Sequence, residues 1–303
     1  MSKQTELQKK LTALIPDVSM RFYEPMAKHT SFRIGGPAEV MVFPKNAQEL
    51  ADVIRVSNLL DSKIAILGAG TNVLAPDEGL CGIIICLKDS MDGMQLLEGN
   101  RICVAAGVTM TRAAIFAASN GLSGLEFAHG IPGTVGGGAY MNAGAYGGEI
   151  CQVCESVEIM RENGDVVTLT ADQMEFSYRH SRMEGTKDII LSVTFLLQPK
   201  PETEIRAVMQ ELMRKRSNSQ PLDLPSAGSA FKRPVGGYAA ALIDEAGLKG
   251  FRVGDAAISE KHAGFAVNLG KATAADVQEL LKEVSYKVFE NSGIKLEPEV
   301  RIW

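Results

Sequence analysis

Residues 129–148 read HGIPGTVGGGAYMNAGAYGG, a window of twenty residues that contains eight glycines. Ordering a glycine costs more backbone entropy than ordering any other residue, so a folded chain keeps many of them only where the backbone must turn sharply or be approached closely. A second glycine-rich stretch, GAGTN at 68–72, directly follows the short apolar segment KIAIL at 63–67. One such stretch is explained by structural turns. Two of them favour a ligand that lies along the backbone.

Neither stretch matches a standard nucleotide-binding motif. A dinucleotide fingerprint needs a third glycine where this sequence has Val73, followed by a helix, which Pro76 prevents. GIPGTVGGGA lacks the Lys-Ser/Thr ending of a P-loop. Bare backbone N–H groups in a tight strand-to-strand loop can still hold a phosphate as a nest, and Thr134 adds a hydroxyl donor. The two stretches together suit an extended, pyrophosphate-containing cofactor.

The composition places the chain among ordinary globular proteins. Of its 303 residues 46% are hydrophobic and 22% charged, the net charge is −5 and the pI is near 5.5. Nothing in these values favours nucleic acid or an anionic membrane surface as a partner. No apolar run is long enough to cross a bilayer, and the N-terminus lacks a signal-peptide core. We therefore expect a cytoplasmic protein, and without a heptad seam we expect a monomer.

The cysteines support the same compartment. Their number is odd and they are scattered through strand-like stretches, which fits a reducing cytosol better than a disulfide framework. Cys151 and Cys154 form a CxxC, but no second pair and no histidines at ligand spacing follow it. We therefore expect no metal site.

Apolar periodicity and turn residues predict an α+β fold. Strands are expected at 39–43, 63–67, 82–87, 101–107, 153–160, 165–169 and 189–197, with a turn at 92–94 between the third and the fourth. Helices are expected between an N-cap at Asn46 and Asp61, where Leu50, Val53 and Ile54 fall at helical spacing, at 109–120, closed by Gly121, and at 203–216, 238–248 and 273–291. In the last of these, Thr273 and Asp276 resemble a capping box, and one apolar stripe is formed by Val277, Leu280, Leu281, Val284 and Val288. PKPET at 199–203 marks a boundary before a last third of different character.

Two polar clusters could carry chemistry. FSYRHSR at 176–182 contains Tyr178 and Arg179, and an arginine among polar residues can clamp a carboxylate, although an exposed surface arginine is the simpler explanation. SAGSAFKRP at 226–234 places Ser229 on a glycine-led bend. A nucleophilic serine needs a histidine partner, which the sequence does not identify, and Phe231 replaces the last glycine of a GxSxG elbow. A hydrolase is therefore disfavoured.

A third candidate lies at the C-terminus. LEPEVRIW at 296–303 carries Glu297 and Glu299, which alternate with apolar residues. That alternation is also typical of a solvated strand face, so the pattern alone assigns these carboxylates no chemistry.

Nine segments in order, from about residue 29 to 302, resemble the UDP-N-acetylenolpyruvoylglucosamine reductase family. They are HTSFRIGGPA, LGAGTNVL, GIPGTVGG, NAGAYGGEI, SYRHS, QPLDLPSAGSAFKRP, ALIDEAGLKG, HAGFAVN and LEPEVRI. Each segment is moderately specific, whereas the ordered set is highly specific. The chain resembles the shorter, type II subclass, which lacks an inserted substrate-capping element.

The resemblance implies a flavoenzyme of peptidoglycan precursor synthesis. It implies an α+β, two-subdomain FAD-binding fold of the vanillyl-alcohol-oxidase type at 1–90 (joined by 294–303) and 91–200, with a C-terminal α+β substrate domain at 201–293. NADPH would reduce the FAD, and UDP-N-acetylglucosamine enolpyruvate would then become UDP-N-acetylmuramate in the same cleft. The glycines would admit the FAD pyrophosphate and ring system.

The resemblance also implies roles for individual residues. Arg179 and Glu299 would polarise the enolpyruvyl carboxylate, favouring hydride delivery from flavin N5 to the alkene carbon β to it, and Glu299 would need a raised pKa to stand beside that anion. Ser229 would donate the proton. Tyr178, Lys232 and Arg233 would bind substrate. The implied cofactor residues are Gly68, Ala69, Gly70, Thr71, Asn72, Gly130, Ile131, Pro132, Gly133, Thr134, Gly136, Gly137 and Arg216.

Two positions and two alternatives stay open. Many relatives have asparagine where this chain has Arg233, so this arginine either contacts phosphate or points away. His262, within HAGFAVN, is best explained as a packed structural histidine. A flavin oxidase of the same fold would use oxygen instead of NADPH, and it has no need for the carboxylate clamp. A non-catalytic UDP-sugar-binding protein would have no need for Arg179, Ser229 and Glu299.

Overall fold

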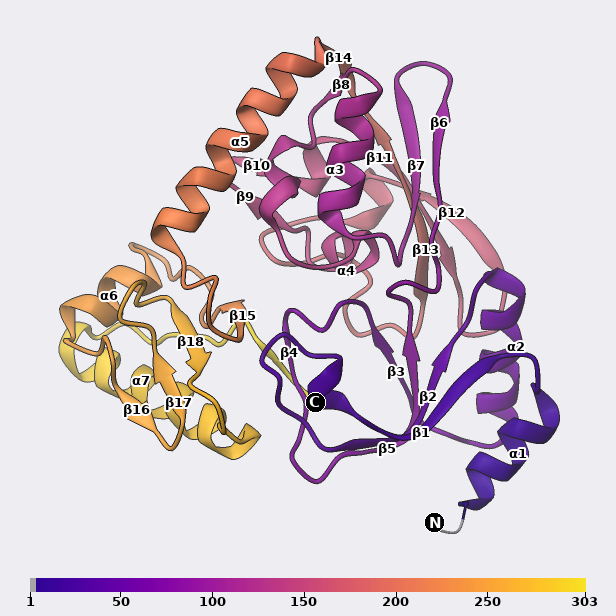
Figure 1. Cartoon of the computed structure of the whole chain (residues 1–303), viewed down its shortest axis with the longest axis horizontal. Coiled ribbons are helices and arrows are strands. Elements are labelled where there is room, and N and C mark those ends of the chain that lie inside the picture. Colours follow the sequence, from indigo (N-terminus) through magenta and orange to yellow (C-terminus); the bar gives the residue numbers. More distant parts are fainter. Residues whose placement is uncertain (1–3) are drawn as a thin grey trace. The chain divides into compact units, whose positions relative to one another are not determined.

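The computed structural model describes residues 4–303, which form two compact units (Figure 1). The first unit comprises the chain up to Phe22, then Glu39–Ala69 and Cys81–Arg214. The second comprises Tyr23–Ala38, Gly70–Leu80 and Lys215–Trp303. Each unit thus combines segments that are far apart in the sequence. The three-domain division given above is finer than this one and stays a prediction.

The first unit contains a five-stranded antiparallel sheet in the order β12-β11-β13-β7-β6. Its strands are Val166–Thr170, Cys154–Met160, Ile189–Leu196, Arg101–Ala105 and Met94–Leu97, respectively. The prediction missed β6. After the turn at 92–94 the chain forms β6. A second turn at 98–100, in which Gly99 and Asn100 have positive φ, lets β6 pair with β7.

A four-stranded sheet has the order β1-β2-β5-β3, with bounds Ser19–Pro25, Pro37–Phe43, Leu80–Cys86 and Ile64–Leu67. β3 and β5 are parallel. Helices α1 (Glu6–Leu14) and α2 (Ala47–Leu59) belong to the first unit. The predicted N-cap of α2 is confirmed, because the Asn46 side chain accepts a hydrogen bond from the Glu49 N–H at 2.9 Å. The predicted apolar stripe of α2 is buried.

The glycine window of 129–148 is not a continuous loop. The 3-10 helix η2 (Glu126–Gly130) leads into it, and α4 (Val135–Tyr140) lies within it. A Cβ on Gly136 would lie 2.8 Å from the Ala106 Cβ, so this glycine lets α4 approach the end of β7. Close packing inside the protein therefore explains part of the glycine content. The hairpin β9–β10 (Gly144–Ala145, Gly148–Glu149) and η3 (Ile150–Gln152) follow.

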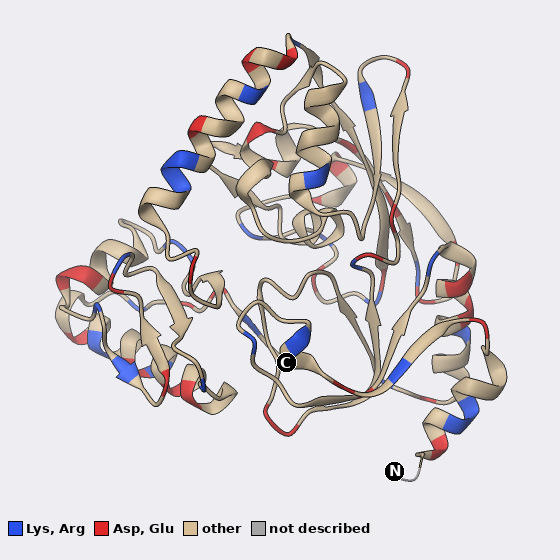
Figure 2. Ribbon diagram, in the orientation of Figure 1, with Lys and Arg blue, Asp and Glu red and all other residues tan. Residues whose placement is uncertain are grey.

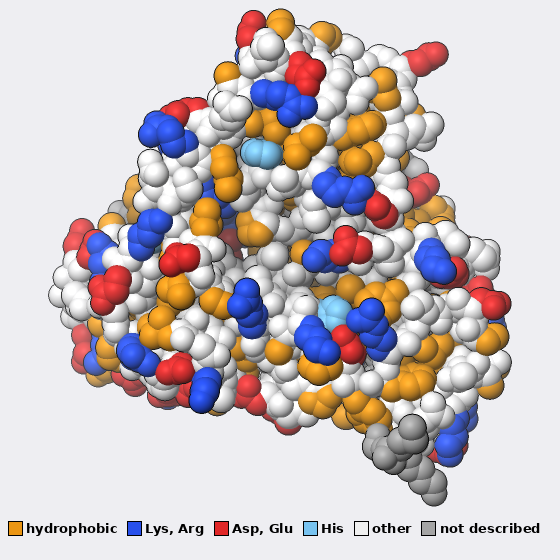
Figure 3. Space-filling view, in the orientation of Figure 1, with side chains coloured by type: hydrophobic (Ala, Val, Ile, Leu, Met, Phe, Trp, Pro, Cys, Tyr) orange, Lys and Arg blue, Asp and Glu red, His pale blue; other side chains and the backbone are white. Residues whose placement is uncertain are grey.

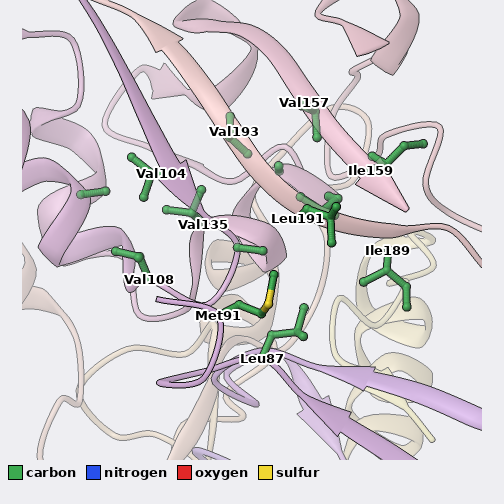
Figure 4. Packing of buried hydrophobic residues seen from close by; sticks show 14 of the residues in the cluster. Leu87, Met91, Val104, Val108, Val135, Val157, Ile159, Ile189, Leu191 and Val193 are labelled. Atoms are coloured by element: carbon green, nitrogen blue, oxygen red, sulfur yellow. The ribbon is translucent and has the colours of Figure 1, made fainter. Parts of the chain in front are cut away.

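Figure 4 shows how α4 packs against the core of the first unit. Val135 of α4 points toward Val104 of β7 and Val193 of β13, and all three are fully buried. Removing apolar side chains from water is the main source of stability, so the sheet and the short helix hold each other in place. The helical middle part of the glycine window is thereby attached to a rigid sheet.

Five further elements belong to this part of the chain. α3 (Met110–Ser119) ends before Gly121, which has a φ of +67°, as predicted. Two short strands, β8 (Leu122–Ser123) and β14 (Gln198–Pro199), form an antiparallel pair. η4 is Asp172–Met174, and α5 (Glu202–Ser219) carries glutamates in its first turn and Arg216 in its last, which matches the helix dipole (Figure 2).

The second unit contains a four-stranded sheet in the order β15-β18-β17-β16, with helices α6 (Ala239–Glu245) and α7 (Ala274–Ser292). The strands are Ser226–Ser229, Phe265–Asn268, Ala256–Ile258 and Arg252–Val253. The predicted capping box of Thr273 and Asp276 is confirmed, and so is the buried stripe of α7, formed by Val277, Leu280, Leu281, Val284 and Val288. α6 ends earlier than the predicted 248.

Distant segments complete the second unit. β4 (Val73–Leu74), which follows the GAGTN stretch, pairs in parallel with β19 (Arg301–Ile302) near the C-terminus. The Asp77 carboxylate accepts hydrogen bonds from the backbone N–H groups of Ala274 and Ala275 at the start of α7. η1 (Met26–Lys28) also belongs here. The C-terminal residues are therefore fixed in place by residues around position 75.

Candidate functional site

The two glycine-rich stretches meet within the first unit. A Cβ on Gly68 would lie 2.5 Å from the Thr134 Oγ1, closer than real Cβ atoms come to other atoms. Thr134 is buried, and its hydroxyl caps α4 by accepting a hydrogen bond from the Gly137 N–H at 3.3 Å. Gly68 is therefore required by the contact between the stretches. The sequence alone attributed it to the approach of a ligand.

The turn after β3 presents backbone donors. Within residues 4–303, the N–H groups of Gly68, Ala69 and Gly70 donate no hydrogen bond to the protein. Gly70 has a φ of +61°, and a Cβ there would clash with the His29 carbonyl. Successive amides that include a left-handed residue form a concave donor surface for an anion. The predicted nest thus has a structural basis at this turn.

Asn72 connects this turn to the C-terminal segment inside the second unit. Its side-chain Nδ2 donates to the Glu299 carbonyl at 3.2 Å, and its own carbonyl accepts from the Arg301 N–H at 3.0 Å. This use of the Asn72 amide was not visible in the sequence, because the partners are more than 200 residues apart. The amide helps to fix the backbone of Glu299.

Ser229 and Glu299 lie on neighbouring backbone segments of the second unit. The Glu299 N–H donates to the carbonyl of Ala230, the residue after Ser229, at 2.9 Å. The Ala230 N–H in turn donates to the Gly264 carbonyl at 2.8 Å. Gly228, with a φ of +76°, forms the glycine-led bend that the sequence indicated. Two of the three predicted catalytic residues are thus brought together, and the Ser229 side chain is exposed to solvent.

Lys232 extends the same antiparallel arrangement. Its N–H donates to the Glu297 carbonyl at 2.8 Å, and its ammonium forms an ion pair with the Glu297 carboxylate. Glu297, which the sequence pattern placed on a solvated strand face, is largely exposed. Lys232 therefore has a replaceable anionic partner next to Ser229.

Arg233 is engaged within its own loop. Its guanidinium carbon lies 4.1 Å from the centre of the Tyr238 ring, and its Nε donates to the Gly237 carbonyl at 3.4 Å. A guanidinium stacked on an aromatic face keeps its positive charge. Tyr238, which the sequence did not single out, is thus a neighbour of one predicted substrate residue.

Arg179 lies in a tight turn of the first unit. Ser177 and His180 exchange both backbone hydrogen bonds, at 3.1 and 3.2 Å, and Arg179 between them has a φ of +56°. A left-handed conformation is costly for a residue with a Cβ and is retained where surrounding structure imposes it. The guanidinium lies 5.1 Å from the Tyr178 ring centre and donates to the Gly144 carbonyl at 3.5 Å. The predicted pair Tyr178 and Arg179 is therefore a preformed cationic feature.

Arg216 is nearly buried, with 8% of its surface exposed. Its Nη1 donates to the Gln220 side chain at 3.3 Å. A guanidinium is seldom buried without groups that stabilise its charge. Its position near the end of α5 is compatible with the predicted role toward phosphate, which stays a prediction.

Cys151 and Cys154 do not have the character of reactive thiols. Burial raises the pKa of both, and it raises that of Cys154 to about 12. Because the thiolate is the form that attacks and binds metals, both side chains are poor nucleophiles at neutral pH. Across residues 4–303, no group of three His, Cys, Asp or Glu side chains is arranged to hold a metal ion.

Charges of both signs are interspersed over the face of the molecule in Figure 3. An anionic ligand must therefore be met by local donors such as those above. Among the helices of the described residues, none combines the length and apolarity that a bilayer crossing requires.

Comparisons with known proteins match two family models to this chain. Residues 38–170 match an FAD binding domain, and residues 220–303 match the C-terminal domain of UDP-N-acetylenolpyruvoylglucosamine reductase. A UDP-N-acetylenolpyruvoylglucosamine reductase from Agathobacter rectalis is 43% identical over 97% of both chains. One from Pediococcus pentosaceus is 42% identical over 95% of both chains.

Solved structures give the same result. A UDP-N-acetylenolpyruvylglucosamine reductase from Thermus caldophilus is 37% identical and superposes with a TM-score of 0.80, covering 94% of this chain and 98% of that one. A 6-hydroxy-D-nicotine oxidase from Arthrobacter nicotinovorans superposes with a TM-score of 0.50 at 14% identity, covering 93% of this chain and 62% of that one, which indicates a shared fold alone. The predicted fold class is thereby confirmed.

Proposed function

This chain belongs to the UDP-N-acetylenolpyruvoylglucosamine reductase family, and we propose that it reduces UDP-N-acetylglucosamine enolpyruvate to UDP-N-acetylmuramate in peptidoglycan precursor synthesis. FAD is its cofactor and NADPH its reductant. The observation that carries the proposal is the hydrogen-bonded alignment of the Ser229 bend with the Glu299 segment. A reduction that needs a proton donor next to a carboxylate-binding group requires such an alignment.

The residues present fit a pyrophosphate-containing cofactor. The amides of Gly68, Ala69 and Gly70, which have no hydrogen-bond acceptor among residues 4–303, form a surface of donors for an anion, and Thr134 fixes the adjacent stretch. We assign these residues, together with the other predicted residues of 68–72 and 130–137 and Arg216, to the cofactor. When bound, the flavin supplies the hydride that the protein itself lacks.

The side chains of this chain stabilise charge and deliver a proton. Arg179 pairs with the enolpyruvyl carboxylate, and Glu299, in its protonated form, stabilises the enolate that develops there, as fixed groups do in preorganised sites. The Ser229 hydroxyl donates its proton to the carbon α to the carboxylate. Lys232 leaves Glu297 for a substrate phosphate or carboxylate, and Tyr178 and Arg233 contribute to substrate binding.

Anaerobic spectroscopy tests this function directly. The purified protein is expected to show a flavin absorption band that NADPH bleaches and that UDP-N-acetylglucosamine enolpyruvate restores, with UDP-N-acetylmuramate as the product. Recovery of the band with oxygen and an alcohol substrate, but not with the enolpyruvyl sugar, would indicate the oxidase alternative. UDP-sugar binding without NADPH oxidation would indicate a binding protein.

Two finer assignments belong to this proposal. We place the enzyme in the cytoplasm, consistent with free cysteines and with a nucleotide-sugar substrate. We also assign it as a monomer, which light scattering at working concentration would test.

A further inference from the structure

The turn that carries Arg179 is held by two buried polar side chains that the proposed function does not use. One is Asn142, which is 1% exposed, and the other is Ser181, which is fully buried. Both lie in the first unit, as does Arg179. A buried polar group is retained only where it makes specific hydrogen bonds, so their partners show what they support.

The Asn142 side chain connects the Arg179 turn to the segment 149–151. Its Nδ2 donates to the Ser177 carbonyl and to the Glu149 carboxylate, each at 3.1 Å, and its Oδ1 accepts from the Cys151 N–H at 3.0 Å. These partners fix the orientation of the amide, because a carbonyl and a carboxylate only accept and a backbone N–H only donates. Ser177 is the first residue of the Arg179 turn. Asn142 itself has a φ of +43°, in the left-handed region that asparagine adopts more readily than most residues.

Ser181 fixes the other end of the same turn. Its hydroxyl donates to the Tyr140 carbonyl at 2.8 Å, at the end of α4. Tyr140 and Asn142 are separated by one residue, so both ends of the Arg179 turn are tied to the same short segment after α4. That helix packs on the sheet core, which gives the segment a rigid base.

We propose that Asn142 and Ser181 are positioning residues that fix the direction of the Arg179 guanidinium. The proposal rests on the function proposed for Arg179 above. A turn held at one end could rotate, and a guanidinium on a long side chain amplifies a small rotation of its backbone. With both ends fixed, Arg179 is held in its left-handed conformation before substrate arrives. Misplacement of about 1 Å at a reacting centre costs on the order of a hundredfold in rate.

The two half-reactions, followed separately by stopped-flow flavin absorbance in the FAD-loaded full chain, test the proposal. Ser181→Ala is expected to slow flavin reoxidation by UDP-N-acetylglucosamine enolpyruvate about tenfold, and Asn142→Gly about a hundredfold, while reduction by NADPH is unchanged. Glycine accepts the positive φ of Asn142, and Ser181→Ala is the milder change if Asn142→Gly does not fold. The matched control is Ser57→Ala, because the Ser57 hydroxyl is also buried and donates to a backbone carbonyl at 2.8 Å, but within α2.

A double-mutant cycle separates positioning from simple support of the fold. In an Arg179→Ala background, Ser181→Ala is expected to slow reoxidation no further, because residues that act through one group are not additive. If the losses of reoxidation rate were additive, or if both half-reactions slowed equally, the positioning proposal would be overturned. The role assigned to Arg179 itself would not be affected. Full-rate reoxidation by Arg179→Ala alone would remove that role, and the positioning proposal with it.

Discussion

The first unit offers mainly backbone to a ligand, whereas the second offers side chains. In the first, Gly68 and Ala69 of the turn after β3 are small residues whose amides are unpaired within the described chain. In the second, Ser229, Lys232 and Glu299 come from two segments joined by backbone hydrogen bonds. A backbone surface suits a large ligand that stays bound, because many weak donors act together. Side chains suit the reacting atoms, where one proton or charge decides the rate.

Two of the glycines have an internal reason that the sequence did not reveal. Glycine is required at positions 68 and 136 because Thr134 and Ala106, respectively, lie where a Cβ would be. Glycine removes a side chain for any neighbour, whether it is a ligand or the protein itself. The backbone surface of the first unit therefore depends on internal packing as much as on the ligand.

Replacing Ser229 tests this division most severely. Ser229→Ala is expected to lower kcat about a thousandfold, because the loss of a general acid typically costs a factor of 10²–10⁴. Flavin content and the rate of reduction by NADPH are expected to stay unchanged, since both belong to the backbone surface. Steady-state turnover and stopped-flow flavin absorbance measure the two.

Ser292→Ala, in the same unit at the end of α7, is the control for Ser229→Ala. Unchanged turnover in Ser229→Ala would remove the proton-donor assignment. Loss of bound flavin in that variant would contradict the division between the units.

Replacing Gly68 tests the backbone surface. Gly68→Ala forces a methyl group to within 2.5 Å of the Thr134 hydroxyl, and overpacking of this kind costs about 1–3 kcal/mol. The affinity for FAD is expected to fall tenfold or more, with kcat nearly normal once FAD saturates the enzyme. Titration of the apoprotein with FAD, followed by flavin fluorescence, measures the affinity.

Gly93→Ala controls for the substitution itself, because a Cβ at Gly93 meets nothing within 4 Å. Equal FAD affinity in both variants would show that contact between the glycine-rich stretches is irrelevant to the cofactor.

The sequence predicted individual helices and strands better than the contacts between them. The caps of α2 and α7 and the stripe of α7 were predicted correctly, because capping and helical periodicity are local signals. β6 was missed because the turn that pairs it with β7 begins four residues after the turn that was noticed. The bond from Asn72 to the Glu299 backbone and the clamp by Asn142 and Ser181 depend on long-range register, which no local pattern encodes.

The ion pair of Lys232 with Glu297 allows a finer test of the side-chain surface. Lys232→Met is expected to raise KM for the enolpyruvyl sugar about tenfold, because a charge-assisted contact is lost. Glu297→Gln is expected to lower KM by less, about twofold, since an exposed ion pair holds Lys232 only weakly. Initial rates against substrate concentration measure both.

Lys282→Met is the matched control, because Lys282 forms an exposed ion pair with Glu279 in the same unit. If KM rose equally in Lys282→Met and Lys232→Met, the effect would be one of overall charge, and Lys232 would lose its assigned place at the substrate.

The smallest effect we expect compares the acid stability of the two units through one histidine in each. Burial lowers the pKa of His129 in the first unit and of His262 in the second. Below about pH 6.5 the unfolded chain binds protons that these folded side chains resist, so stability that is present above that pH is lost as the pH falls further. The Tm of the wild type is expected to fall accordingly, and His129→Phe or His262→Gln to reduce that fall by on the order of 1 °C each.

His180→Gln is the control, because the His180 ring pairs with the Glu184 carboxylate at 2.8 Å and is partly exposed. Scanning calorimetry between pH 7.5 and 5 measures the decrease in Tm. If neither variant reduced this decrease, the loss of stability in acid would be assigned to carboxylate pairs, and the two units would not differ in this respect.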